Sequence, residues 1–376
     1  MNKIFDCGIL NFWYTNNYGA VLNCYALQET IKKLGYNPQV INYVKNRKTF
    51  DGRLSDCFSK KYLNLTDKCD TFDELKKLNR QTGTFIAGSD QIWRYRYFWP
   101  HGKNIFQLNF ADSESKKIAY AASFGTDEFE GCRLDTALTK YDMQRFDAIS
   151  VREDDGINIC RDTFGVAATH VLDPVFLPDV KDWNELIDNS ACKDKGFIAS
   201  YVLDKSAHTD KLIDFTSQKI GTEKIINMVN AQSSKTCEQS VEDWLYAIKN
   251  CKFFITDSFH GACFAIIFNK PFICLANISR GYSRFKSLFE VFGLENRCIL
   301  TADDTENNPD LFSEVDYSSV NTVLKTEKER SLNWLKEALK SPKQVQSVSQ
   351  AQLDDIMEVI PVSYTHLRAH ETGRNL

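Results

Sequence analysis

Short apolar runs alternate with amphipathic segments along most of the chain. In the first part, continuous apolar runs predict buried strands at residues 3–12, 38–44, 84–88, 117–125, 147–151 and 168–176. Segment 20–35 instead repeats apolar residues such as Leu22 and Ile31 at helical spacing, and Gly35 is suited to end that helix. Strands that alternate with helices predict βαβ units and a parallel sheet.

The second part of the chain repeats this pattern. Further strands are predicted at residues 196–204, 223–229, 252–258 and 270–276, with helices at 206–221, 240–251 and 261–270. Pro174 and Pro178 interrupt both kinds of element between the two parts. We therefore predict an α/β protein with two Rossmann-like domains facing each other across a cleft, which is a GT-B-like arrangement of parallel sheets.

The boundaries follow from the same pattern. Residues 1–175 are expected to form the first domain, residues 176–325 the second, and residues 326–360 a C-terminal charged amphipathic helix. Segment 45–80 has clustered charge and weak periodicity, which indicates an insertion or a mobile segment. Residues 361–376 lose the preceding periodicity, and we interpret them as a non-native tail whose histidines carry no function.

Composition narrows the class of protein. A formal net charge of −4 argues against a general nucleic-acid binder. The 12 cysteines include no CxxC pair and lack the spacing of a metal site, so we predict reduced thiols and no metal. No window approaches the roughly 18 apolar residues that a membrane helix needs, and no signal peptide is evident. We expect a cytoplasmic protein, with the inner face of the membrane as a peripheral location.

Two polar clusters follow predicted strands of the first domain. Asn17, Tyr18 and Gly19 open the first helix, where free amides suit an anion or a sugar hydroxyl. The motifs of a dinucleotide site and of a P-loop are both missing there, and simple capping by Asn17 is the alternative.

The second cluster lies in FIAGSDQIWR, residues 85–94. Ser89, Asp90 and Gln91 come directly after a strand, and Trp93 follows them. A sugar ring needs an aromatic face and polar partners, so this is a candidate sugar site. The alternative is an aromatic core with Asp90 as a helix cap.

Cationic and titratable residues end other strands. Arg152 follows the strand at 147–151, where a planar guanidinium suits a carboxylate or a phosphate. In FITDSFHG, Ser258, His260 and Gly261 lie at the turn from a strand to a helix, so His260 is a candidate acid or base. The loop after the last predicted strand supplies further cations, Arg280 and Arg284.

Taken together, these motifs resemble the polysaccharide pyruvyl transferase family. The resemblance rests on NNYGAVLNCYALQ, FIAGSDQIW, ISVRE, HVLDPVF, FITDSFHG and RGYSRF, in this order, from about residue 7 to residue 300. It implies a GT-B-like enzyme that transfers pyruvate from phosphoenolpyruvate to sugar hydroxyls as a ketal. Such enzymes serve the assembly of bacterial capsule, exopolysaccharide or cell-wall glycan, with a free or lipid-linked sugar acceptor and no cofactor.

The resemblance also suggests roles for individual residues. It places Arg152 and His260 at the phosphoenolpyruvate, with His260 as the acid. Many members carry an arginine two residues before that histidine, where this chain has Ser258. The missing charge must then come from Arg280 or Arg284. Asp90 is the candidate base toward the acceptor.

Two other functions stay open at this point. The first is a GT-B glycosyltransferase that uses a nucleotide sugar, because a shared fold does not settle chemistry. The second is a non-catalytic glycan-binding relative that has lost its donor site, which Ser258 would explain. The acceptor sugar and the oligomeric state are not indicated by the sequence.

Overall fold

The computed structural model describes residues 4–44, 54–97, 104–229, 239–278, 281–301 and 304–344. Within these residues the chain forms two parallel sheets, of seven and five strands. The strands of the first sheet are β1 Cys7–Leu10, β2 Pro38–Asn42, β3 Leu65–Lys68, β4 Thr84–Ala87, β5 Lys116–Ala122, β6 Ala148–Val151 and β7 Thr169–His170. Those of the second are β8 Ile198–Tyr201, β9 Ile225–Asn227, β10 Phe253–Thr256, β11 Phe272–Leu275 and β12 Cys298–Ile299.

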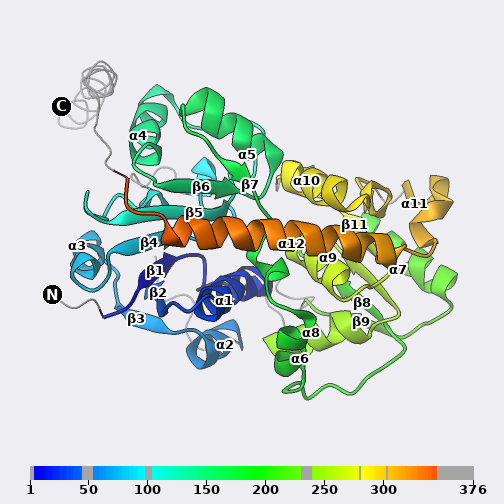
Figure 1. The fold of residues 1–376 in the computed structure, drawn as a ribbon. Helices are drawn as coiled ribbons and strands as arrows, with labels where there is room; N and C mark the ends of the chain where they lie inside the picture. Colours follow the sequence, from blue (N-terminus) through cyan, green and yellow to red (C-terminus); the bar gives the residue numbers. More distant parts are fainter. Residues whose placement is uncertain are drawn as a thin grey trace, which may run out of the picture.

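Helices cover both sheets (Figure 1). Their bounds are α1 Tyr18–Lys33, α2 Leu54–Tyr62, α3 Phe72–Lys77, α4 Arg133–Met143, α5 Asp154–Asn158, α6 Val180–Ile187, α7 Ala207–Ile220, α8 Val241–Asn250, α9 Phe259–Ile267, α10 Tyr282–Phe292, α11 Asp304–Asn307 and α12 Tyr317–Lys340. Because helices lie on both faces, the central strands are buried throughout, as β5 and β10 are. We call the part with the first sheet the first domain and the part with the second sheet the second domain.

Strand order places a switch point in each domain. The first sheet runs β3-β2-β1-β4-β5-β6-β7, so successive connections diverge between β1 and β4. The second sheet runs β12-β11-β10-β8-β9 and diverges between β8 and β10. Open α/β sheets bind ligands beyond the carboxyl ends of the strands at such points. The fold therefore offers one crevice in each domain.

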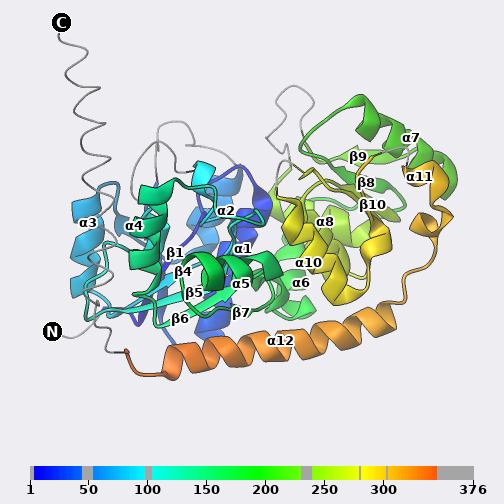
Figure 2. The same cartoon turned by 90° about the horizontal axis from the view of Figure 1, so that it is seen from above.

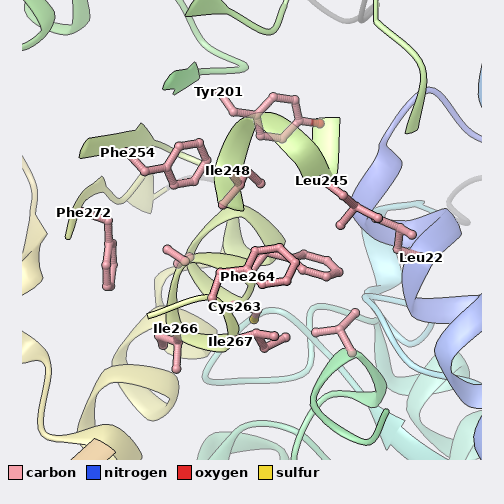
Figure 3. Close-up of a cluster of buried hydrophobic side chains, with 14 of the residues drawn as sticks. Leu22, Tyr201, Leu245, Ile248, Phe254, Cys263, Phe264, Ile266, Ile267 and Phe272 are labelled. Atoms are coloured by element: carbon pink, nitrogen blue, oxygen red, sulfur yellow. The ribbon is translucent and has the colours of Figure 1, made fainter. Parts of the chain in front are cut away.

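A continuous apolar core joins the two domains. Leu22 of α1 packs in the same cluster as Leu245 of α8 and Phe264 of α9, and each of these side chains is fully buried (Figure 3). Helix α12 adds a second connection, because it runs along both domains (Figure 2). Its Leu335 is buried in a first-domain cluster, and its Val320 is buried in the cluster that both domains share.

Several boundaries differ from the expected ones. Segment 54–80 is not irregular, because it holds α2, the edge strand β3 and α3, whose first turn has a capping box between Thr71 and Glu74. Residues 45–53 lie outside the described part of the chain. The strand expected at 168–176 ends at His170, since Asp173 instead caps a short 3-10 helix, η6 Pro174–Phe176.

The C-terminal helix begins at Tyr317 and ends at Lys340, so its first turns lie within the range expected for the second domain. Residues 345–376, with the expected tail, lie outside the described part. Among the described residues, none of the helices has the length and apolar character needed to cross a membrane.

Candidate functional site

A cavity of about 570 Å³ lies where the two switch points meet. Both domains line it, through the segments that follow β1 and β4 in the first and β8 and β10 in the second, together with α10. The lining residues are Phe12, Tyr14, Thr15, Asn16, Asn17, Ala20, Asp90, Gln91, Tyr97, Leu203, Asp257, Ser258, Phe259, His260 and Arg284. Helices α1 and α9 begin at this cavity, so their positive N-terminal ends favour an anion there.

The corner after β10 is built mainly by capping. The Ser258 hydroxyl accepts a hydrogen bond from the Gly261 amide at 3.3 Å and so caps α9. The Asp257 carboxylate accepts the amides of Leu203 and Asp204 at 2.7 and 2.8 Å, which fixes the loop after β8. Gly261 is required by packing, because a β-carbon there would lie 2.4 Å from Oγ1 of Thr256. Ser258 lines the cavity, and Gly261 does not.

His260 lies where the two domains touch. Its side chain is 3% exposed, and its Nε2 lies 3.5 Å from Oδ2 of Asp173. The first helix presses against the other edge of the ring, because a β-carbon at Gly19 would lie 2.5 Å from Nδ1 of His260. The imidazole therefore lines the cavity from a tightly bounded position.

Arg152 lies behind the cavity wall in a buried ion-pair network. Its Nη1 donates to Oδ2 of Asp173 at 2.6 Å, and its Nη2 donates to Oδ1 of Asp90 at 2.8 Å. Its guanidinium carbon also lies 4.4 Å from the centre of the Phe259 ring, across the domain boundary. The sequence predicted Arg152 as a donor-binding residue, but it is not among the residues that line the cavity, because these two carboxylates hold it beneath them.

Asp90 lines the cavity in a strained backbone conformation. Its φ of 70° lies in the left-handed region, which non-glycine residues adopt at a cost. Burial would raise the pKa of its carboxyl, but Arg152, His260 and Arg284 hold that pKa below the usual value. Asp90 is thus ionised at neutral pH, and its oxygens can accept hydrogen bonds from a ligand.

Among the described residues of the second domain, Arg284 is the Lys or Arg side chain that lines the cavity. Its Nε donates to the carbonyl of Gly281, and its guanidinium carbon lies 5.2 Å from the centre of the Phe259 ring. Its Nη1 lies 4.0 Å from Oδ1 of Asp90. Burial and the neighbouring Arg152 charge lower the pKa of Arg284 to about 10. A bound anion beside Arg284 would stabilise its charged form. Arg280, its predicted companion, lies outside the described residues.

The predicted residues of the first domain divide into two groups. Asn17 caps α1 and lines the cavity, and Gln91 lines it while accepting a hydrogen bond from Arg94. The others, Tyr18, Gly19, Ser89 and Trp93, do not line it.

These four residues contact other parts of the protein, and Gly19 packs against the His260 ring. Tyr18 donates its hydroxyl hydrogen to the carbonyl of Gln239, and Ser89 donates to the carbonyl of Ala121. Trp93 is buried, and its indole N–H donates to the carbonyl of Phe106. Trp93 therefore belongs to the aromatic core that the sequence left open as the alternative.

The structure also brings in residues that the sequence reasoning missed. Phe12 and Tyr14 add aromatic surface to the first-domain wall beside Tyr97, and the Phe259 ring of the second domain contacts the guanidinium groups of both Arg152 and Arg284. Asp173 is the largest omission, because it links Arg152 and His260. The DP pair in HVLDPVF was its only signal, since proline after an acid often marks a turn.

The described residues provide neither a metal-binding cluster nor a disulfide. Across the described ranges, no group of three His, Cys, Asp or Glu side chains has a metal-binding arrangement. The described cysteines are free thiols, and burial raises the pKa of several of them, that of Cys7 to about 12.

Comparison with known proteins gives a family and a fold. A family model described as polysaccharide pyruvyl transferase matches residues 17–279. A search of curated proteins finds no significant match. Among solved structures, the S. aureus MnaA–UDP complex is 11% identical with a TM-score of 0.55, over 93% of this chain and 99% of that one. Medicago truncatula UGT71G1 complexed with UDP-glucose is 8% identical with a TM-score of 0.50, over 90% and 98%. At these identities the likeness concerns the fold alone, and it confirms the predicted GT-B-like arrangement.

Proposed function

The chain belongs to the polysaccharide pyruvyl transferase family, and from this premise we propose that it transfers pyruvate from phosphoenolpyruvate to hydroxyls of a sugar residue as a ketal. One observation carries the proposal. A buried histidine, a buried arginine and the N-terminus of α9 line one cavity from the second domain, opposite a carboxylate and aromatic side chains of the first. A strongly anionic donor and a sugar acceptor each find matching groups there.

The donor is assigned to the second-domain wall. Arg284 and the first-turn amides of α9 offer positive charge and hydrogen bonds to a carboxylate and a phosphate. The Ser258 hydroxyl is available beside them as a further hydrogen-bonding group. Because Ser258 stands where many family members carry arginine, Arg284 is proposed to supply the missing charge. Its position over the Phe259 ring, next in sequence to Ser258, supports that role.

The acceptor is assigned to the first-domain wall. Aromatic faces at Phe12, Tyr14 and Tyr97 can stack on a sugar ring, while Asn17 and Gln91 can bind its hydroxyls. These three aromatic residues take the place that the sequence analysis gave to Trp93. Asp90 lies between the two walls and would accept a hydrogen bond from the attacking hydroxyl.

The reaction follows from these positions. His260, when protonated, gives its proton to the methylene carbon of phosphoenolpyruvate, and the adjacent carbon gains oxocarbenium character. A sugar hydroxyl attacks that carbon and loses its proton, which can return to His260. A second hydroxyl then displaces the phosphate, which leaves with the remaining proton as hydrogen phosphate.

Electrostatics sets the roles of the other groups. Arg284 would neutralise the donor, and this interaction strengthens as phosphate departs with more charge. Asp90 is a weak base, because neighbouring cations lower its pKa. It is therefore better suited to orient a hydroxyl, which becomes acidic only during the attack. Arg152 would act indirectly, by fixing Asp90.

The wider setting is proposed from the family name. A polysaccharide or a precursor of one is the expected acceptor, either free or carried on a lipid, in the assembly of a bacterial capsule, exopolysaccharide or cell-wall glycan. Cytoplasmic phosphoenolpyruvate would be the donor, with no added cofactor. A lipid-linked acceptor would bring the protein to the inner face of the membrane.

Acceptor-dependent phosphate release tests this proposal. Wild type, His260→Gln and His208→Gln would be mixed with phosphoenolpyruvate and a panel of glycosides, and released phosphate would be measured. His208 is an exposed histidine of α7 and serves as the matched control. We expect release that needs an acceptor, falls about 100-fold or more in His260→Gln, and persists in His208→Gln. Binding of UDP without any response to phosphoenolpyruvate would support a nucleotide-sugar transferase instead.

A further inference from the structure

Asp173 occupies the point where four elements of the site converge. It follows β7 and begins η6, and its carboxylate is 1% exposed. The side chains around it come from α1, from the segments after β4 and β6, and from α9 of the second domain. They are Asn23, whose Nδ2 lies 2.8 and 2.9 Å from the two oxygens, Ser89 at 3.3 Å, Arg152 at 2.6 Å and His260 at 3.5 Å.

Those contacts saturate Asp173 with donors. Asn23 and Arg152 can only donate in these pairs, and the amide of Val175 donates to Oδ1 at 3.1 Å. The single hydroxyl hydrogen of Ser89 goes to the nearer carbonyl of Ala121, at 2.7 Å, so Ser89 is a polar neighbour of Asp173 and not one of its donors. An imidazole nitrogen that faces the same carboxylate is favoured when it carries hydrogen. At 3.5 Å the Nε2 contact is a charge contact rather than a tight hydrogen bond, and such contacts shorten when a ligand closes a site.

We propose that Asp173 is a positioning residue that holds hydrogen on Nε2 of His260, so that Nδ1 is the nitrogen that exchanges a proton with the ligand. The assignment rests on the proposed function for the identity of that ligand. The tautomer of the His260 ring is independent of the proposed function, because the contacts within the protein determine it.

The other edge of the ring supports this assignment. Gly19 of α1 faces Nδ1, and any side chain at position 19 would overlap the ring. Glycine at this position therefore lets α1 approach the Nδ1 edge without a clash, while the buried Nε2 faces Asp173. His260 lines the cavity, and because its Nε2 is buried, the ring meets the cavity through its other atoms. The two contacts together fix both the tautomer and the orientation of the imidazole.

Asp173 is suited to the role because it stays ionised. Burial by itself would raise the pKa of this carboxyl, but His260 and Arg152 hold the pKa well below its usual range. The charged groups nearby are Asp90 and Arg152 from the first domain and Arg284 from α10. Among these, Asp173 is the carboxylate that lies within ion-pair distance of the His260 ring.

Nitrogen NMR of the histidine rings tests the proposal without any substrate. The full chain would be labelled with ¹⁵N-histidine, and His260 would be assigned by its loss in His260→Gln. For the neutral ring of wild-type His260, we expect the signals to show hydrogen on Nε2. A ring with hydrogen mainly on Nδ1 would overturn the proposal, and this arm needs no destabilising variant.

Two variants then ask whether Asp173 is the cause. Asp173→Ala is expected to abolish the tautomer preference and to lower kcat by about 100-fold or more. Asn23→Ala removes another partner of Asp173 from the same buried cluster without touching His260, so the preference should persist there. An unchanged tautomer in folded Asp173→Ala would refute the assignment.

Turnover is read separately. Absence of phosphate release in the wild type, with hydrogen on Nε2 of His260, would contradict the proposed reaction and leave the role of Asp173 in place.

Discussion

Gly19 of α1 and His260 of α9 meet so closely across the domain boundary that a β-carbon at position 19 would lie 2.3 Å from Cβ of His260. Gly19 is part of a helix, where glycine usually costs about 1 kcal/mol relative to alanine. This destabilising residue lies directly against His260, the candidate acid. We therefore expect that Gly19 affects the reaction by leaving room for the His260 ring in its observed position.

Replacement of this glycine should displace the imidazole. Gly19→Ala is expected to reduce acceptor-dependent phosphate release at least about tenfold, and to lower the free energy of unfolding by about 1–3 kcal/mol through overpacking. Gly156→Ala in α5 is the matched helical control, because a β-carbon there would meet Val151 at the milder distance of 3.1 Å. Equal losses of activity in both variants would argue against a specific contact.

The proposed role of Arg284 in donor binding can be tested by removing its positive charge and restoring a positive charge at position 258. Arg284→Gln is expected to weaken phosphoenolpyruvate binding about 10- to 100-fold, the scale of one charge-assisted hydrogen bond. Ser258→Arg in that background should recover part of the affinity, because it returns a cation to the same wall. Calorimetric titration measures both, with exposed Arg161→Gln as the control. Unchanged affinity in Arg284→Gln would remove this residue from the donor site.

Buried Glu153 should give folding stability an unusual pH dependence. Its Oε1 accepts the amides of Phe124 and Gly125, and burial raises the pKa of the carboxyl. A raised pKa means that the folded state holds the proton more tightly. The stabilising contribution is therefore complete below the unfolded pKa of about 4.3 and is lost as pH rises through the folded value.

Denaturant unfolding of wild type and Glu153→Gln across pH 4 to 7 isolates this effect. The free energy of unfolding of the wild type minus that of the variant should fall as pH rises, by at most about 1.4 kcal/mol per pH unit. Asp90 and Asp173 have lowered pKa values and change stability in the opposite direction, but they are common to both proteins and cancel. A flat or rising difference would contradict the assigned direction.

Helix α12 should couple the stability of the two domains. The Leu335 side chain is fully buried against the first domain. Ser331 accepts the Leu172 amide at 2.9 Å near the domain junction. Leu335→Ala is expected to cost about 2–5 kcal/mol of unfolding free energy, whereas exposed Lys336→Ala should cost little. Calorimetry of Leu335→Ala should still give one transition. A separate unfolding transition of the first domain would contradict the prediction that the shared core makes the two domains unfold together.

The sequence was most informative where strands are buried on both faces. Segment 117–125 and segment 252–258 read as strands because their apolar runs have no competing helical pattern, and β5 and β10 are found there. Asp90, Ser258 and His260, which lie at or just after the ends of predicted strands, all line the cavity, and their catalytic and donor-binding roles stay predictions. Edge elements were less readable, since β3 is half exposed and its charged residues hide the periodicity.

Long-range contacts were beyond the reach of local pattern. Asp173 meets Asn23 across 150 positions of sequence, and nothing near either residue indicates the other. Trp93 was assigned to sugar binding because it follows a carboxylate, yet the turn after Asp90 directs it into the core. Arg152 was placed correctly at a strand end, but its burial beneath two carboxylates depends on the tertiary fold.

The central claim is the transfer of pyruvate itself, and labelled carbon follows it most directly. Wild type would be incubated with [2-¹³C]phosphoenolpyruvate and each glycoside of the panel, and the products examined by ¹³C NMR and mass spectrometry. We predict a ketal carbon attached to two oxygens of one sugar, formed with an equal amount of phosphate and missing in His260→Gln. Label found only as free pyruvate or unreacted donor, with an acceptor that is shown to bind, would contradict the account.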